Sequence, residues 1–204
     1  MQQSSTILLA ASYNLMIDGF ELETGQPVCE FEIQNTQANK LVTSPDHRFY
    51  APSYSYVFAF DFNSKSQKAI QAIIAHEGNV TDLIMSNHTF FTCGDDKKVK
   101  IWDRRSAQSS ATITTKNQNN AMVLLPDSNI IVVGDEAGYL SSYDIRNTNL
   151  LKSTKIDDGP IRCMSISPDN KQFIVSAQSG VTRSYTVSDT EPYKESFVIH
   201  AHND

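Results

Sequence analysis

The chain has 204 residues, of which 40% are hydrophobic and 20% are charged. This length and composition are enough to bury a sizeable core, which excludes an intrinsically disordered protein. The formal net charge of −6 argues against a nucleic-acid-binding surface, because such surfaces depend on clustered Lys and Arg. Nucleic acid is therefore not expected among the partners.

The N-terminal residues and the cysteines bear on where the protein resides. The first six residues carry no basic side chain, and the apolar run at 7–11 is too short for a signal core or a membrane span. We therefore expect a cytoplasmic protein without membrane insertion. Cys29, Cys93 and Cys163 are widely spaced and odd in number, so we expect buried hydrophobes rather than disulfides or a zinc site.

A sequence repeat organises the whole chain. An aromatic residue followed by a polar one recurs at intervals of 40, 42, 41 and 42 residues, at Phe20, Phe60, Trp102, Tyr143 and Tyr185. About fifteen residues upstream lies a turn signature, at 44–46, 86–87, 126–127 and 167–169. Short β-branched and aromatic runs lie between these markers and show no helical periodicity. The pattern predicts an all-β chain with four short strands per repeat, as in propeller blades.

We expect one propeller domain over residues 6–204. The expected blades are 7–34, which lacks its first strand, 38–75, 79–116, 119–156 and 160–200.

The third unit has the most complete motif. It reads His76-Glu-Gly-Asn-Val80, Phe91-Thr-Cys-Gly-Asp-Asp96 and Val99-Lys-Ile-Trp-Asp103. These segments resemble the WD-repeat family, whose blades join a His, a Ser or Thr, an Asp and a Trp in one hydrogen-bonded relay. The resemblance assigns the relay to His76, Thr92, Asp96 and Trp102. Its expected role is structural, because a satisfied polar network fixes a turn.

The other units depart from that relay. At the Asp position they carry Asn14, Tyr54, Ala137 and Ser179. We therefore expect only the third relay to be complete, which lowers the expected stability but leaves the fold unchanged.

Read in order, the units carry a more specific resemblance. The segments concerned are Ile7–Asn14, Gly19–Gly25, Asn39–Arg48, Asn120–Asp127 and Ile131–Gly138. Together they resemble the small WD-repeat subunits of target-of-rapamycin kinase complexes, over about residues 6–204. The resemblance implies a non-catalytic scaffold that binds and supports the kinase domain in growth signalling. Its expected partners are a target-of-rapamycin kinase and the other subunits of its complex, and no cofactor is expected.

Members of that family have seven blades, so the chain is expected to hold five blades of a seven-bladed ring. Three explanations stay open: a truncated sequence, a closed five-bladed ring, or an arc that another chain completes.

An alternative function comes from Trp102–Arg105 and Tyr143–Arg146, which match a short pattern of substrate receptors in cullin-RING ubiquitin ligases. We favour instead exposed arginines that bond a neighbouring blade.

An enzyme is not expected. The sequence has no phosphate-binding Gly-rich loop, nucleophile elbow, zinc-protease helix motif or Cys pair with metal spacing, so no catalytic, metal or cofactor-binding residue is assigned. The Asp95-Asp96 and Asp157-Asp158 pairs fit turns. The natural candidates for partner binding are the loops at 34–39, 116–120 and 157–160.

Overall fold

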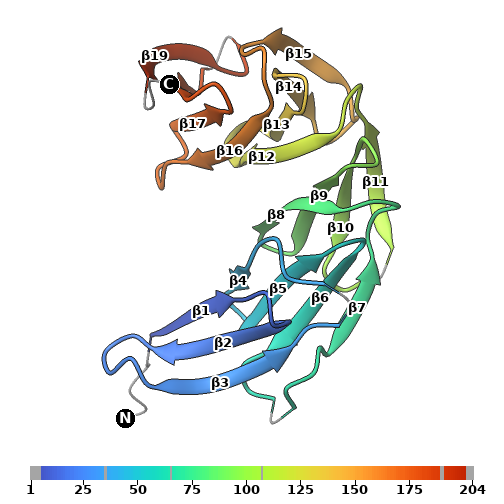
Figure 1. Ribbon diagram of the computed structural model, residues 1–204. Helices are drawn as coiled ribbons and strands as arrows, with labels where there is room; N and C mark the ends of the chain where they lie inside the picture. Colours follow the sequence, from blue (N-terminus) through green and yellow to red (C-terminus); the bar gives the residue numbers. More distant parts are fainter. Residues whose placement is uncertain (1–5, 35, 65, 107, 189–190, 201–204) are drawn as a thin grey trace. The chain divides into compact units, whose positions relative to one another are not determined.

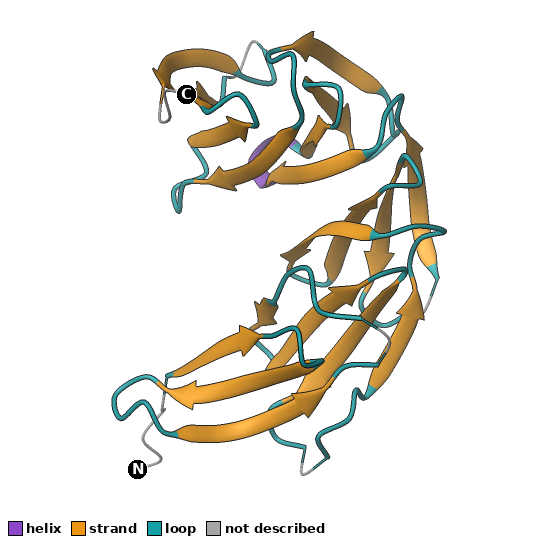
Figure 2. Cartoon of the chain, in the orientation of Figure 1, coloured by secondary structure: helices purple, strands orange, loops and turns teal. Residues whose placement is uncertain are grey.

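The computed structural model describes residues 6–34, 36–64, 66–106, 108–188 and 191–200 (Figure 1). In this part of the chain the strands form five antiparallel sheets, and helix is limited to the short 3-10 turn η1 at Pro126–Ser128 (Figure 2). Within each sheet, neighbours in sequence are neighbours in space. This is the predicted all-β architecture.

The strand bounds follow the predicted repeat. The first sheet has β1 (Ile7–Ala11), β2 (Met16–Glu21) and β3 (Pro27–Glu32). The second has β4 (Val42–Ser44), β5 (Arg48–Ser53), β6 (Tyr56–Asp61) and β7 (Gln71–Ile74). The third has β8 (Val80–Ser86), β9 (Thr89–Gly94), β10 (Lys98–Asp103) and β11 (Ser109–Thr114). The fourth has β12 (Asn119–Leu125), β13 (Ile130–Asp135), β14 (Tyr139–Asp144) and β15 (Leu150–Lys155). The fifth has β16 (Ile161–Ile166), β17 (Gln172–Ala177), β18 (Val181–Thr186) and β19 (Lys194–His200).

The chain divides into two compact units, Met1–Val80 and Thr81–Asp204. Each unit is described by itself below. The single domain over 6–204 stays a prediction.

The repeated aromatic residue has the same place in four sheets. Phe20, Trp102, Tyr143 and Tyr185 each come directly after a register shift between the last two strands of their sheet. Such a bulge inserts one extra residue and increases the local twist. On its other side the aromatic residue pairs with the preceding strand, as in Trp102 with Phe90. The repeat found in the sequence therefore marks one fixed register position.

The predicted turn signatures lie between the first and second strands. Each of these turns contains a residue with positive φ, namely His47, Asn87, Asn129 and Asn170. Asn and His tolerate this left-handed conformation better than most residues with a Cβ. The polar turn residues thus end one strand and start the next.

Phenylalanine rings form the core of the first unit. Phe49 of β5 and Phe60 of β6 stack with ring centroids 4.8 Å apart. Phe31 of β3 meets the Phe49 ring edge-on at 5.0 Å and the Phe60 ring at 5.5 Å. All three are buried, so aromatic contacts join the first sheet to the second.

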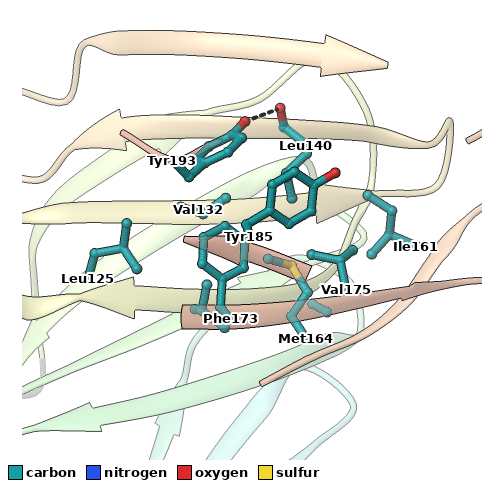
Figure 3. Close-up of a cluster of buried hydrophobic side chains, with 11 residues drawn as sticks. Leu125, Val132, Leu140, Ile161, Met164, Phe173, Val175, Tyr185 and Tyr193 are labelled. Atoms are coloured by element: carbon teal, nitrogen blue, oxygen red, sulfur yellow. Dashed lines mark hydrogen bonds between the residues drawn. The ribbon is translucent and has the colours of Figure 1, made fainter. Parts of the chain in front are cut away.

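Two apolar clusters hold the second unit together. One joins the third and fourth sheets around Phe91, Met122 and Ile131. The other joins the fourth and fifth sheets, where Phe173 stacks on Tyr185 with centroids 5.1 Å apart (Figure 3).

Tyr193 closes this second cluster from the segment between β18 and β19. Its ring meets Phe173 edge-on at 5.5 Å, and its hydroxyl donates to the Leu140 carbonyl of β14 at 3.2 Å (Figure 3). The Lys152 ammonium lies 4.9 Å from the ring centroid. Burial raises the pKa of the Tyr193 hydroxyl, so it remains a donor.

The fifth sheet packs on one face only within the described residues. Its other face exposes Ile174, Phe197 and Ile199, each 46% to 52% exposed. Cys163 of β16 is exposed as well, whereas Cys93 is buried and Cys29 is partly buried. The expectation of three buried cysteines is therefore wrong for Cys163, because its side of the sheet lies away from the apolar cluster.

Two substitutions of Tyr193 distinguish the contribution of its ring to stability from that of its hydrogen bond. We expect Tyr193→Ala to lower the free energy of unfolding by about 3–5 kcal/mol, since it leaves a cavity in the core. Tyr193→Phe should cost only about 0.5–1.5 kcal/mol, the usual net worth of one hydrogen bond. Urea denaturation followed by circular dichroism measures both, with Tyr13→Phe as control because Tyr13 is 87% exposed. Equal losses for the two Tyr193 variants would contradict this assignment.

Candidate functional site

Two loops and two turns of the second unit lie at one end of its last two sheets. We call this end the loop face and define it by the loops 116–120 and 157–160 and the turns 135–138 and 177–180. The Glu136 amide donates to the Gln118 carbonyl at 3.0 Å, and the Asp157 amide donates to the Gly138 carbonyl at 3.3 Å. Two of the three loops predicted for partner binding therefore share one surface. The third, 34–39, belongs to the first unit.

Gly138 allows the turn 135–138 to pack closely against the loop 157–160. Its φ is +80°, and a Cβ at this position would lie 2.1 Å from the Asp157 carbonyl oxygen. Such an approach excludes any side chain, because the blocking atom belongs to the backbone. The glycine is thus required both by its own conformation and by the neighbouring loop.

The predicted relay in the third repeat is seen in part. Trp102 Nε1 donates to Thr92 Oγ1 at 2.9 Å, and Asp96 Oδ1 accepts the Lys98 amide at 3.2 Å. His76 is buried, but it belongs to the first unit. The full four-residue relay therefore stays a prediction.

The fourth repeat fixes its turn with different residues. Ala137 stands at the Asp position, yet Asp135, two residues earlier, supplies the carboxylate. Asp135 Oδ1 accepts the Ala137 and Tyr139 amides at 3.0 and 2.8 Å, and Oδ2 accepts Asn117 Nδ2 at 2.8 Å. Asn117 lies at the repeat position of His76. Loop and turn are thus joined without the family's residues.

In the fifth repeat the donor and the acceptor of this hydrogen bond exchange places between loop and turn. Its carboxylate comes from the loop and its hydroxyl from the turn: Ser179 Oγ donates to Asp157 Oδ2. Asp157 Oδ1 also accepts the Gly159 amide at 2.9 Å.

The second repeat joins loop and turn through two hydroxyls. Thr36 Oγ1 and Ser53 Oγ lie 2.8 Å apart, and Ser53 Oγ also donates to the Thr36 carbonyl at 2.6 Å. In the first repeat Asn14 Oδ1 accepts the Met16 amide at 3.0 Å. These bonds stand at the places of the missing relay residues, and the expected loss of stability stays a prediction.

A second set of bonds ties neighbouring sheets of the second unit. Thr81 Oγ1 donates to the Asn119 carbonyl at 2.6 Å, and Asp82 Oδ2 accepts the Met122 amide at 2.9 Å. One repeat further, Asn120 Nδ2 donates to the Ile161 carbonyl at 3.0 Å. These bonds hold each new first strand against the preceding repeat.

The loop face carries both signs of charge. Arg162 of β16 extends the loop face, because it lies 3.8 Å from Glu136 Oε2 and also donates to Gln178 Oε1. Lys155 pairs with Asp158 at 3.0 Å, which raises the pKa of Lys155. These pairs are largely exposed, so they contribute little to stability and remain able to contact a partner.

The two arginines of the ligase-like pattern bind their own aspartates. Arg105 contacts both carboxylate oxygens of Asp103, at 3.1 and 2.8 Å, and Arg146 does the same with Asp144, at 2.9 and 2.6 Å. The expectation that they bond a neighbouring blade is wrong. Each aspartate also accepts the amide of its arginine, so the pair caps a turn two residues long.

The described residues contain no group of three or more His, Cys, Asp or Glu arranged to hold a metal ion. Within the same part of the chain, no helix has the length and hydropathy needed to cross a membrane.

A family model and a solved structure match this chain. The family described as "WD domain, G-beta repeat" matches residues 67–103, which include β8, β9 and β10. A chain from a crystal structure of the mitotic checkpoint complex matches with a TM-score of 0.84 and 17% identity, over 97% of this chain and 62% of that one. The fold is that of WD-repeat propeller blades.

Sequence relatives are more specific. The target of rapamycin complex subunit wat1 of Schizosaccharomyces pombe is 25% identical over 87% of this chain and 58% of its own length. The subunit LST8 of Saccharomyces cerevisiae is also 25% identical, over 86% of this chain and 59% of its own length. The chain is similar to target of rapamycin complex subunits over most of its length. The resemblance predicted from the order of the repeats is thereby confirmed. The chain spans less than two thirds of these relatives.

Removal of the Asn117 amide tests the substitute bond in the fourth repeat. We expect Asn117→Ala to lower the free energy of unfolding by about 1–3 kcal/mol, because Asp135 is buried and loses a hydrogen-bond donor. Asn63→Ala, at an exposed position, is the control and should change it by less than about 0.5 kcal/mol. Urea denaturation measures both. No difference between the variants would show that the bond contributes nothing.

The aspartate–arginine turns predict a measurable titration. Hydrogen bonds from the neighbouring arginine lower the pKa of Asp144 to about 2, and Asp103 behaves alike. Because the folded-state pKa is lowered, each pair favours folding above about pH 4 and loses that effect as the pH falls towards 2. Arg146→Ala should return the pKa of Asp144 towards its ordinary value of about 3.9. Carboxyl NMR titration measures this, with Asp103 in the same variant as the unchanged control.

Proposed function

We propose that this protein is a non-catalytic scaffold subunit of a target of rapamycin complex that binds the kinase domain and supports its active state in the cytoplasm. The observation that carries the proposal is the extent of the similarity. Relatives named as subunits of this complex align with 86% to 87% of the chain, so the match runs through successive repeats. A match confined to the generic motif would cover only one repeat.

The second unit supports a binding role through its rigidity. On the loop face, the bonds of Asn117 to Asp135 and of Ser179 to Asp157 hold loops against turns. Loops that are already ordered lose little conformational entropy when a partner binds. A scaffold needs such a surface and requires no reacting group of its own.

We further propose that the kinase contacts the loop face. The face combines exposed Lys116, Glu136 and Arg162 with the amides of Gln118 and Gln178. Such a mixed polar surface suits a rim of complementary charges and hydrogen bonds. The turns at the opposite end of the same sheets, at 126–128 and 168–171, provide a matched control region.

Affinity purification from cells of the source organism tests the proposal. The tagged chain should recover a target of rapamycin kinase. Arg162→Glu, on the loop face, should reduce the recovered kinase about tenfold, because reversed charges on a contact surface oppose binding. Lys171→Glu, at the opposite end, should leave recovery unchanged.

Two outcomes would contradict the proposal at different levels. Recovery of other proteins, such as cullin-RING ligase subunits, with no such kinase would overturn the function. Equal loss with Lys171→Glu and no loss with Arg162→Glu would overturn only the choice of face.

A further inference from the structure

A groove of about 720 Å³ lies between the fourth and fifth sheets, at the end opposite the loop face. Its lining includes Leu125 and Ile130 of the fourth sheet and Val187 and Pro192 of the β18–β19 connection. Leu151 of β15 continues this apolar lining to the surface, where it is 47% exposed. Ligand sites typically measure about 300–1,000 Å³, so the groove has the size of a binding site.

One wall of the groove comes from a connection that is longer than its counterparts. The β18–β19 connection covers residues 187–193, whereas the β10–β11 and β14–β15 connections cover 104–108 and 145–149. The groove touches the longer connection at 187–188 and at 191–192. Within the second unit, this wall is therefore a feature of the last repeat.

The last residues of this connection are already held in place. The Tyr193 hydroxyl donates to the Leu140 carbonyl at 3.2 Å, and the ring is buried in the core cluster (Figure 3). Lys152 Nζ donates to the Tyr193 carbonyl at 3.3 Å and to Glu191 Oε2 at 2.9 Å. A wall that is ordered in this way loses little conformational entropy when a partner binds.

Two of the charged residues that line the groove have a charge of opposite sign beside them. Glu191 accepts a hydrogen bond from Lys152, which lowers the pKa of Glu191. Lys171 lies beside Asp169, where a hydrogen bond from Ser167 and the amide and charge of Lys171 lower the pKa of the carboxyl. Glu191 and Lys171 therefore add little net charge to the groove.

Asp127 of η1 adds a negative charge that nothing balances. Its carboxylate forms neither an ion pair nor a hydrogen bond with any residue that the structure describes, and the residue is exposed. The groove thus combines apolar walls with one unbalanced carboxylate at its rim. The whole chain, with a formal net charge of −6, also attracts positively charged partners.

We propose that the groove binds an extended segment of a partner protein in which an aliphatic side chain lies beside Lys or Arg. The aliphatic side chain would lie against Leu125, Ile130 and Val187, and the basic group would pair with Asp127. Because the groove opens over Leu151, a polypeptide can enter and leave it, which an enclosed pocket would not allow. This binding does not require the kinase contact proposed for the loop face, since the groove lies at the other end of the same sheets.

NMR titration of the isotope-labelled chain with capped peptides tests the proposal. The probe is acetyl-Leu-Leu-Arg-amide, and its matches are acetyl-Leu-Leu-Glu-amide and acetyl-Ser-Ser-Arg-amide. We expect saturable shifts at the amides of 127–130, 151 and 187–188, with the probe about threefold tighter than the Glu peptide, as for an exposed ion pair. The Ser peptide should bind at least about tenfold more weakly, because it buries no aliphatic side chain. Equal affinity for the Arg and Glu peptides, or no saturable shift in the groove, would overturn the proposal.

Two variants at exposed positions locate the binding. Asp127→Asn should abolish the preference for the Arg peptide over the Glu peptide, whereas Asp158→Asn on the loop face should retain it. Leu151→Ser should weaken the probe by about threefold or more, because it removes apolar lining. Leu8→Ser, at an exposed leucine of the first unit, should leave the affinity unchanged. A preference that survives Asp127→Asn, or equal binding by the two Leu→Ser variants, would contradict the proposal.

Discussion

The need to cover two apolar faces of each sheet governs this protein. The second strands β5, β9 and β13 are buried at every position after their first residue, so both faces of their sheets carry apolar side chains there. A sheet of four short strands cannot bury two faces alone, and each repeat depends on its neighbours. The stacked aromatic rings, the bulges and the bonds between sheets all serve this requirement. Where the described chain provides no cover, as over Ile174 and Phe197, apolar side chains are exposed.

A second requirement is that each loop be joined to the neighbouring turn by a hydrogen bond. Different residues form this bond in each repeat. The pairs Thr36–Ser53, Asn117–Asp135 and Asp157–Ser179 occupy corresponding places, yet they combine hydroxyl with hydroxyl, amide with carboxylate, and carboxylate with hydroxyl. What the fold requires is one hydrogen bond at that place, because a turn that leaves polar groups unpaired is costly. Such freedom explains how repeats can lose the family's residues and keep the blade.

This separation of packing from surface chemistry suits a protein that binds others. The core packing recurs from sheet to sheet, whereas the residues that join loop to turn differ between repeats, so each loop can acquire its own contacts without disturbing a blade. The aspartate–arginine turns belong to the repeated framework: both arginines are held by their own aspartates. The individual feature is the loop face.

The sequence by itself determined the repeat, the strands, the turns and the resemblance to target of rapamycin complex subunits. These follow from local signals, since aromatic spacing, β-branched runs and Pro or Asn turns act over a few residues. The tertiary structure alone decided that Asp135 replaces the missing aspartate, that Arg105 and Arg146 bind within their own turns, and that Cys163 is exposed. The reason is physical: these features depend on which side chains meet across loops and sheets, and the spacing of motifs along one strand does not specify such meetings.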